Sequence, residues 1–163
     1  MNAADYAIEV SHLVTHYGPR KILDDVCVQA RQGEIMVIMG GSGSGKSTLL
    51  RHLLGLHQPT SGSIKLLGKD ITKLSADQMY DLRKNMGVAF QGGALFNSMT
   101  VGENVELPLR EHTKLDANTI RIMSRMKLEV VNLAGFENLM PSALSGGMIK
   151  RAALARAIVM DPR

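Results

Sequence analysis

The sequence predicts an α/β fold, and three adjacent features carry that prediction. Residues 40–48 read Gly-Gly-Ser-Gly-Ser-Gly-Lys-Ser-Thr, which fits the phosphate-loop pattern G-x-x-x-x-G-K-[ST]. The largely apolar residues 34–39 before this loop are interpreted as a buried strand. Leucines follow the loop at the spacing of one helix face, at positions 49, 50, 53 and 54. Strand, loop and helix therefore come in the order that a phosphate-binding loop requires.

The chemistry of this loop depends on its glycines, on one lysine and on one serine. Glycine accepts positive φ angles, so successive backbone N–H groups can turn toward a single anion. The helix that begins near Lys46 adds the positive end of its dipole at the same place. Lys46 can reach the β- and γ-phosphates of a nucleotide, and the Ser47 hydroxyl can ligate Mg²⁺. A flexible Gly/Ser linker is the alternative interpretation, and the flanking strand and helix disfavour it.

The composition fits one α/β domain or a piece of a larger one, with 163 residues of which 45% are hydrophobic. The net charge of +4 is a mild bias that identifies neither a polyphosphate nor a membrane partner. The single cysteine, Cys27, excludes an intrachain disulfide and is interpreted as a small core residue. No run approaches the roughly 20 apolar residues that span a bilayer, so the chain is expected to be soluble and to reach any membrane through a partner.

Two strands are predicted before the loop. Residues 7–14 and 22–30 both alternate apolar and polar side chains, and the turn-forming residues 16–19 lie between them. The pair is therefore predicted to form an antiparallel hairpin. Tyr17 carries the only aromatic ring of this link. Its ring can stack on a nucleotide base or simply cover the hairpin, and the residues alone do not choose.

The middle of the chain is predicted to continue with a strand, a helix and a second strand. Residues 62–67 form the first of these strands, and Ser75 with Gln78 resembles a capping box that opens the helix. A short apolar strand at 87–90 follows, and Gln91 comes directly after it. A glutamine at a strand end can reach a metal or a water near the phosphates, and it can equally be an ordinary loop residue.

Residues 98–141 carry no strand signal and are interpreted as a helical insertion. Thr100 opens a capping-box pattern, and Pro108 is expected to stop the helix that follows. Asp116 can cap a longer helix, which Gly135 is expected to end.

The last predicted helix starts at a serine and two glycines. Ser145 is a good N-cap, and Gly146 and Gly147 leave the first turn open to a close ligand. Arg156 is grouped with the charged side chains opposite the apolar face. A basic, glycine-rich helix start is a second candidate anion site. A capped amphipathic helix without a ligand is the alternative, and both interpretations remain open from the residues alone.

Three motifs in this order make the sequence resemble a known family. They are the phosphate loop, Gln91, and Leu-Ser-Gly-Gly-Met at residues 144–148 followed by an Ala-rich helix. Together they resemble the nucleotide-binding subunit of an ABC transporter over nearly the whole chain. Residues 91–96, 108–113 and 144–158 are also similar to the ATPase of the Mla branch. That branch moves phospholipids between the envelope membranes of Gram-negative bacteria, and is also described as toluene-tolerance or organic-solvent-resistance transport.

The resemblance implies a role for each motif residue, with ATP and Mg²⁺ as the ligands. It implies catalytic roles for Lys46 and Gln91, Mg²⁺ contacts from Ser47 and Gln91, and stacking of Tyr17 on adenine. The residues implied to hold the triphosphate are Gly40, Gly41, Ser42, Gly43, Ser44, Gly45, Lys46, Ser47 and Thr48. The residues that match the signature closing on the γ-phosphate of the opposite subunit are Ser145, Gly146 and Gly147.

The resemblance also implies a domain arrangement and partners. An incomplete P-loop ATP-binding core would comprise residues 1–97 and 141–163, with a helical subdomain at 98–140. Two copies would pair head to tail around ATP, and residues from 94 to about 110 would receive a coupling helix of an integral membrane permease. The whole protein would be an ATPase at the cytoplasmic face of the inner membrane, without direct contact to nucleic acid. The alternatives are a soluble ABC ATPase acting on nucleic acid or ribosomes, and a nucleotide-binding module without turnover.

The sequence departs from the family after Asp161 and Pro162. In the family an apolar strand ending in Asp-Glu soon follows, then a switch histidine, and the sequence as given has neither. Hydrolysis by the chain as given is therefore expected to be very slow. The strands ending at Met39 and Phe90 are expected to face a gap in the sheet. The chain is then expected to repack, to swap elements with a second copy, or to self-associate.

Overall fold

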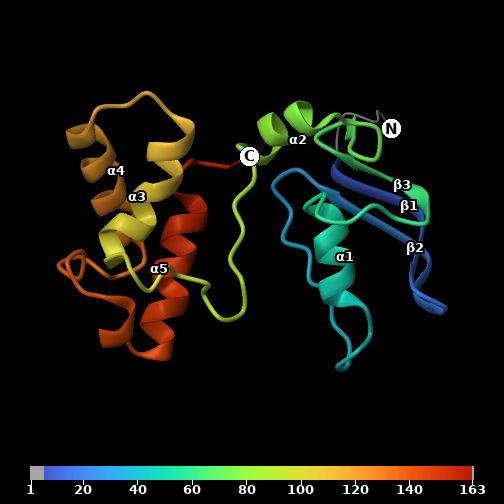
Figure 1. Cartoon of the computed structure of the whole chain (residues 1–163), viewed down its shortest axis with the longest axis horizontal. Coiled ribbons are helices and arrows are strands. Elements are labelled where there is room, and N and C mark those ends of the chain that lie inside the picture. Colours follow the sequence, from blue (N-terminus) through green and yellow to red (C-terminus); the bar gives the residue numbers. More distant parts are fainter. Residues whose placement is uncertain (1–5, 163) are drawn as a thin grey trace. The chain divides into compact units, whose positions relative to one another are not determined.

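The computed structural model describes residues 6–162 (Figure 1). The chain forms two compact units, Met1–Tyr80 and Asp81–Arg163, and helix α2 (Ala76–Arg83) runs across the boundary between them. Within the described residues, every strand belongs to the first unit, and the second unit is built on helices.

A four-stranded antiparallel sheet is the framework of the first unit (Figure 1). Its strands are β1 (Tyr6–Tyr17), β2 (Arg20–Arg31), β3 (Ser61–Leu66) and β4 (Lys69–Asp70), in the order β2-β1-β3-β4. The turn between β1 and β2 is Gly18-Pro19, so the predicted hairpin is confirmed. The buried side chains Val10, Leu13 and Ile64 lie on the core face of the sheet.

Cys27 is exposed, and its interpretation as a small core residue is wrong. Along β2, Val26, Val28 and Ala30 are partly or fully buried, whereas the side chains between them are exposed. Successive side chains of a strand point to opposite faces. Cys27 therefore lies on the solvent face of the sheet.

The predicted strands at 34–39 and 87–90 do not form. Within the described residues, neither segment is hydrogen-bonded into the sheet, and Ile35 and Met39 are 92% and 87% exposed. A strand exists only when its backbone groups pair with a neighbouring strand, and the ladder of β1–β4 does not include these segments. An apolar run by itself therefore does not make a strand.

Helix α1 (Lys46–Leu53) contacts β2 and β3 and is joined to the sheet by one buried polar side chain. His52 is fully buried, its Nδ1 lies 2.9 Å from the His57 carbonyl oxygen, and its Nε2 lies 2.8 Å from the Thr15 hydroxyl. The carbonyl can only accept, so Nδ1 carries the proton and Nε2 accepts from Thr15. Both ring nitrogens are thus satisfied, as a buried polar group requires.

In the second unit, helices α3 (Val101–His112), α4 (Ala117–Val130) and α5 (Gly146–Ile158) pack on one another, with a short 3₁₀ turn η2 (Pro141–Ala143) before α5 (Figure 1). Their shared core consists mainly of Val101, Val105, Leu109, Ile120, Leu128, Leu133, Ala152, Ala155 and Val159. As predicted, residues 98–141 contain no strand. No helix in the described residues has the length and hydropathy needed to cross a membrane.

The helix starts agree with the sequence predictions. Thr100 and Glu103 form a complete capping box at α3, with reciprocal side chain to backbone hydrogen bonds. The Asp116 carboxylate accepts from two backbone N–H groups at the start of α4, and the Ser145 hydroxyl accepts from one at the start of α5. Each cap satisfies backbone donors that have no partner inside the helix.

Two predicted helix ends are wrong. Pro108 lies inside α3, which continues to His112. A proline at this point removes one backbone donor, and burial of Leu109, which is 1% exposed, favours the continued turn. Helix α4 ends at Val130 rather than at Gly135, because Asn132 adopts a left-handed φ of 54°. The Leu133 N–H then bonds to the Leu128 carbonyl, and the Asn132 N–H to that of Glu129, which is the pattern of a Schellman cap.

His52→Ala is expected to lower the free energy of unfolding by about 2–4 kcal/mol, because it leaves a cavity and strips the Thr15 hydroxyl of its buried partner. Urea denaturation measures this. The matched control is His16→Ala, which removes an exposed histidine and is expected to change stability by less than about 1 kcal/mol. Equal losses from the two variants would show that His52 does not join α1 to the sheet.

Candidate functional site

Residues 40–45 of the phosphate-loop motif form an irregular turn, and the motif ends within the first turn of α1. Gly43 and Gly45 have φ angles of 80° and 88°, which side-chain-bearing residues rarely adopt. A Cβ on Gly45 would also lie 2.7 Å from Leu23 Cδ2 and 3.3 Å from the Ile22 carbonyl oxygen. Glycine is thus required at position 45 both by backbone conformation and by close packing on β2.

The start of α1 is left open. Gly45 occupies the N-cap position without a side chain to cap it, and the first turn contains no acidic residue. The first backbone N–H groups of a helix have no partner inside it, and the helix dipole places positive charge at this end. The geometry therefore favours an anion at the start of α1.

Lys46 adds a full positive charge to this loop. Its Nζ donates to the carbonyl oxygens of Gly40 and Gly41 at 2.6 and 2.7 Å and to the Ser44 hydroxyl at 3.1 Å. In the described residues it forms no ion pair with a carboxylate. The ammonium group is thus held at the loop by neutral oxygens, and its charge is available to an anion.

The two hydroxyl residues after Lys46 lie differently. Ser47 is exposed, whereas Thr48 is only 9% exposed. Ser47 is therefore the residue that can reach an ion in solvent, which agrees with the role expected for it. Hydroxyl oxygen is a suitable ligand for Mg²⁺.

Tyr17 lies at the end of β1, beside the Gly18-Pro19 turn, and is 42% exposed. Its ring makes an edge contact with the His57 ring at a centroid distance of 6.0 Å. Part of the ring remains open to solvent, so stacking on a base stays a prediction.

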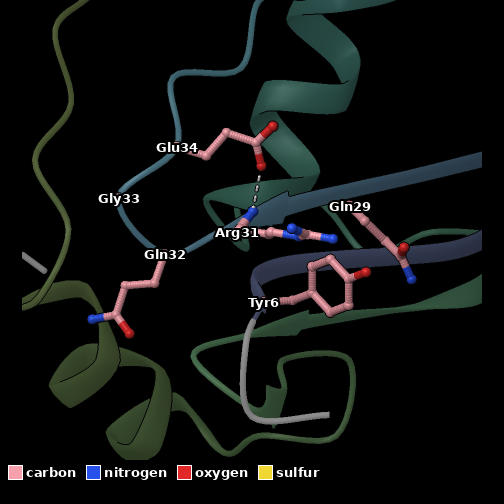
Figure 2. A pocket seen from close by; sticks show the side chains of 6 residues that line it. All are labelled: Tyr6, Gln29, Arg31, Gln32, Gly33 and Glu34. Atoms are coloured by element: carbon pink, nitrogen blue, oxygen red, sulfur yellow. Dashed lines mark hydrogen bonds between the residues drawn. The ribbon is translucent and has the colours of Figure 1, made fainter. Parts of the chain in front are cut away.

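A separate hollow lies at the end of the first hairpin, and Figure 2 shows its lining. It has a volume of about 540 Å³ and is lined by Tyr6, Gln29, Arg31, Gln32, Gly33 and Glu34. The Arg31 backbone N–H donates to the Glu34 carboxylate at 2.8 Å, and the Arg31 guanidinium lies 6.0 Å from the centre of the Tyr6 ring. None of the residues predicted to bind nucleotide lines this hollow.

Gln91 lies in the second unit, exposed in a turn that leads into the loop of residues 92–100. Arg156 of α5 holds the backbone of this loop: its Nη2 donates to the Gly93 carbonyl at 3.0 Å and its Nη1 to the Ala94 carbonyl at 2.9 Å. The guanidinium also lies 5.9 Å from the centre of the Phe96 ring. Burial lowers the pKa of Arg156, because desolvation disfavours its charged form.

Asn104 of α3 holds the same loop from the other side. Its side chain is fully buried, Oδ1 accepts from the Phe96 N–H at 2.7 Å, and Nδ2 donates to the carbonyls of Phe96, Met99 and Thr100. Arg156 and Asn104 together fasten the segment after Gln91 to α3 and α5. Sequence reasoning missed both residues, since it placed Arg156 on the solvent side and gave Asn104 no role.

Ser145, Gly146 and Gly147 lie at the exposed start of α5. The Ser145 hydroxyl accepts from the Met148 N–H at 3.3 Å. A Cβ on either glycine would meet no atom within 4 Å, and neither glycine has a positive φ. The fold of the chain does not require glycine at these two positions. This supports the interpretation that the glycines keep the helix start accessible from outside.

The structure thus brings residues 40–48 together at one helix start, with Tyr17 in the same unit. Gln91 and the start of α5 both lie in the second unit. A glycine loop that ends in Gly-Lys-Ser-Thr at an open helix start is the pattern of P-loop nucleotide-binding proteins.

Residues 23–163 match the sequence model of the ABC transporter family, and the chain belongs to that family. The ATP-binding protein MlaF of the intermembrane phospholipid transport system of Haemophilus influenzae is 50% identical over 155 residues, which are 95% of this chain and 59% of that protein. The probable ribonucleotide transport ATP-binding protein mkl of Mycobacterium leprae is 47% identical over 157 residues, which are 96% of this chain and 45% of that protein. The chain therefore spans about half the length of the curated relatives it matches.

A solved structure supports the same assignment. A dimeric ATP-binding cassette in a post-hydrolysis state, bound to ADP and phosphate, superposes with a TM-score of 0.87 at 31% identity, covering 95% of this chain and 70% of that chain. The predicted α/β fold of the ABC ATPase type and the resemblance to the Mla branch are therefore confirmed. The roles of the individual site residues and the domain limits at 97 and 141 stay predictions.

Asn104→Ala is expected to lower the free energy of unfolding by about 2–4 kcal/mol, because it leaves buried backbone groups of the 96–100 loop without partners. Asn118→Ala, an exposed change on α4, is the matched control and is expected to have an effect within about 0.5 kcal/mol. Chemical denaturation compares the two variants. A loss at position 104 no larger than that of the control would contradict the assigned role.

Proposed function

We propose that the protein is the ATP-binding and ATP-hydrolysing subunit of an ABC transporter that powers phospholipid or organic-solvent transport across the bacterial envelope. The observation that carries this proposal is the open start of α1, where the Lys46 ammonium is bound, among residues 6–162, only by neutral oxygens of the loop. The identity of 50% to a phospholipid transport protein supports the cargo class.

In this proposal, residues 40–48 bind the triphosphate of ATP and Tyr17 stacks on adenine. The backbone N–H groups at the start of α1 would face the phosphate oxygens, and Lys46 would exchange its contacts with Gly40 and Gly41 for phosphate oxygens. The exposed Ser47 hydroxyl and the Gln91 side chain would hold Mg²⁺, which when bound neutralises phosphate charge. Fixed N–H donors and one ammonium group would stabilise the charge that develops during phosphoryl transfer.

We further propose that two copies pair head to tail, with Ser145, Gly146 and Gly147 of one copy facing the γ-phosphate held by the other. The accessible start of α5 and the dimeric state of the solved cassette support this arrangement. An integral membrane permease would be the second partner, so the protein would act at the cytoplasmic face of the inner membrane. The nucleotide core would comprise residues 1–97 and 141–163, and the helical subdomain residues 98–140.

The ribonucleotide transport name of the mycobacterial relative favours a second candidate cargo. In this proposal, residues 40–48, Tyr17 and Gln91 bind the ATP that supplies the energy for transport. They do not form a binding site for the transported molecule. Reconstituting the protein with its permease and comparing labelled phospholipid with labelled ribonucleotide would distinguish the two cargoes. Movement of phospholipid alone is the expected result.

Lys46→Ala is expected to weaken ATP binding by at least about tenfold and to abolish turnover, because the loop loses its only full positive charge. Fluorescent ATP titration and phosphate release, both on the whole protein, measure the two quantities. Lys65→Ala, which removes an exposed lysine of β3, is the matched control. Unchanged affinity in Lys46→Ala would contradict the site, and binding without turnover in the wild type would favour a non-hydrolysing nucleotide module.

Gly147→Ala is expected to preserve or slightly raise thermal stability, because an added Cβ meets no neighbouring atom and alanine favours helix over glycine. The same change is expected to reduce ATP-dependent pairing and turnover by at least about tenfold, because the methyl group would stand where the partner's phosphate must approach closely. Sedimentation with and without ATP measures the pairing. ATP-dependent pairing equal to that of the wild type would contradict the proposed interface.

A further inference from the structure

Three side chains with metal-binding atoms gather on the solvent face of the β1–β2 hairpin. His12, Asp25 and Cys27, here called the hairpin triad, place a ring nitrogen, a carboxylate oxygen and a sulfur within 4.8 Å of one another. His12 Nδ1 lies 2.7 Å from Asp25 Oδ1, and the His12 backbone N–H donates to Cys27 Sγ at 3.3 Å. None of the three takes part in the phosphate loop or in the start of α5.

Two successive bulges bring the triad together. Between the pairs Val10↔Val28 and Leu13↔Val26, β1 has two residues where β2 has one, which is Cys27. Between Leu13↔Val26 and Thr15↔Leu23, the extra residue is on β2 and the two residues are Asp24 and Asp25. Because Leu13 is buried, the neighbouring His12 points to solvent, and the residues on either side of Val26 point the same way. Bulges re-aim side chains and are common beside functional sites.

The backbone at the bulges is in an uncommon conformation. His12 and Asp25 have φ angles of 50° and 51°, which cost energy in residues other than glycine. The bulge in β1 is also fixed from β3, because Gly62 leaves no room for a side chain: a Cβ there would lie 2.4 Å from the His12 carbonyl oxygen. The His12 and Asp25 side chains that make this contact are 77% and 69% exposed, and a contact this exposed contributes little stability. The contact between these two side chains alone therefore does not account for the conformation.

The three ligand types are those that Zn²⁺ takes from proteins. Bonds of about 2.0–2.3 Å in a tetrahedral arrangement place neighbouring ligand atoms about 3.2–3.8 Å apart. The triad atoms lie within 4.8 Å of one another, so small rotations of exposed side chains suffice. A water can complete the fourth position, as it does in zinc sites with three protein ligands.

We propose that the hairpin triad binds one divalent transition-metal ion of the zinc type, which clips β1 to β2. Binding displaces the proton of the Cys27 thiol and any proton on the coordinating His12 nitrogen, and these protons pass to the buffer. Thiolate and imidazole ligands select zinc-type ions over Mg²⁺, so this site is chemically distinct from the nucleotide's Mg²⁺ site. The proposal does not rest on the proposed transport function.

Cobalt(II) is the direct probe, because it occupies tetrahedral zinc sites and gives visible absorption bands and a thiolate charge-transfer band. Titration of the reduced purified protein with Co²⁺, followed by displacement with Zn²⁺, is expected to show one equivalent bound. Cys27→Ser is expected to remove the charge-transfer band, and Cys27→Ser, His12→Gln and Asp25→Asn are each expected to weaken Zn²⁺ binding by at least about tenfold.

Two matched variants complete the test. Asp24→Asn removes an adjacent exposed carboxylate and His16→Gln another exposed histidine of the same hairpin, and both are expected to bind Zn²⁺ like the wild type. Far-UV circular dichroism and ATP affinity report whether each variant remains folded. The proposal is overturned if the wild type binds less than one equivalent. It is equally overturned if His12→Gln or Asp25→Asn binds as tightly as the controls, because the ion would then not be held by all three residues of the hairpin triad.

Discussion

The open start of helix α1 is the constraint on which the candidate nucleotide site depends. Gly45 takes a left-handed conformation against Leu23 of β2, and this conformation aims the first N–H groups of the helix outward without a side chain to cap them. Lys46 then places its ammonium group among the carbonyls of the same loop. Positive potential is thus built from backbone and one side chain in a small volume, which is the requirement for holding a polyphosphate.

In the second unit, side chains rather than a helix start provide the key contacts, through hydrogen bonds to the backbone of one loop. The loop after Gln91 has no regular structure of its own, and it is held by Arg156 and Asn104 through bonds to its carbonyl and N–H groups. Burying a cation without a carboxylate partner is costly. Arg156 has no such partner in the described part of the chain, and carbonyl dipoles and an aromatic face stabilise its charge instead. Gln91 is thereby linked to the helix whose start carries Ser145. In the proposed mechanism, a displacement of one would be transmitted to the other.

The features that the sequence predicts correctly are those formed by residues close together in the chain. The caps at Thr100, Asp116 and Ser145 and the loop glycines involve residues a few positions apart, so their patterns are visible in the sequence. The predicted strand at 34–39 failed because a strand needs a partner that no local pattern supplies. The hydrogen bond from Arg156 to the Gly93 carbonyl joins residues 63 positions apart, and the sequence around either residue does not indicate it. The two bulges that bring His12 near Cys27 are likewise visible only in the pairing of two strands.

The most direct test of the central claim is to observe the backbone amides of the loop while ATP binds. Amide nitrogen–proton NMR of the labelled protein, titrated with Mg²⁺ and ATP, reports the environment of each N–H group. The largest shifts are expected on Gly43, Gly45 and Lys46, because phosphate oxygens approach their N–H groups. If those amides stay unchanged while others shift at saturating ATP, the start of α1 does not hold the triphosphate and the account is contradicted.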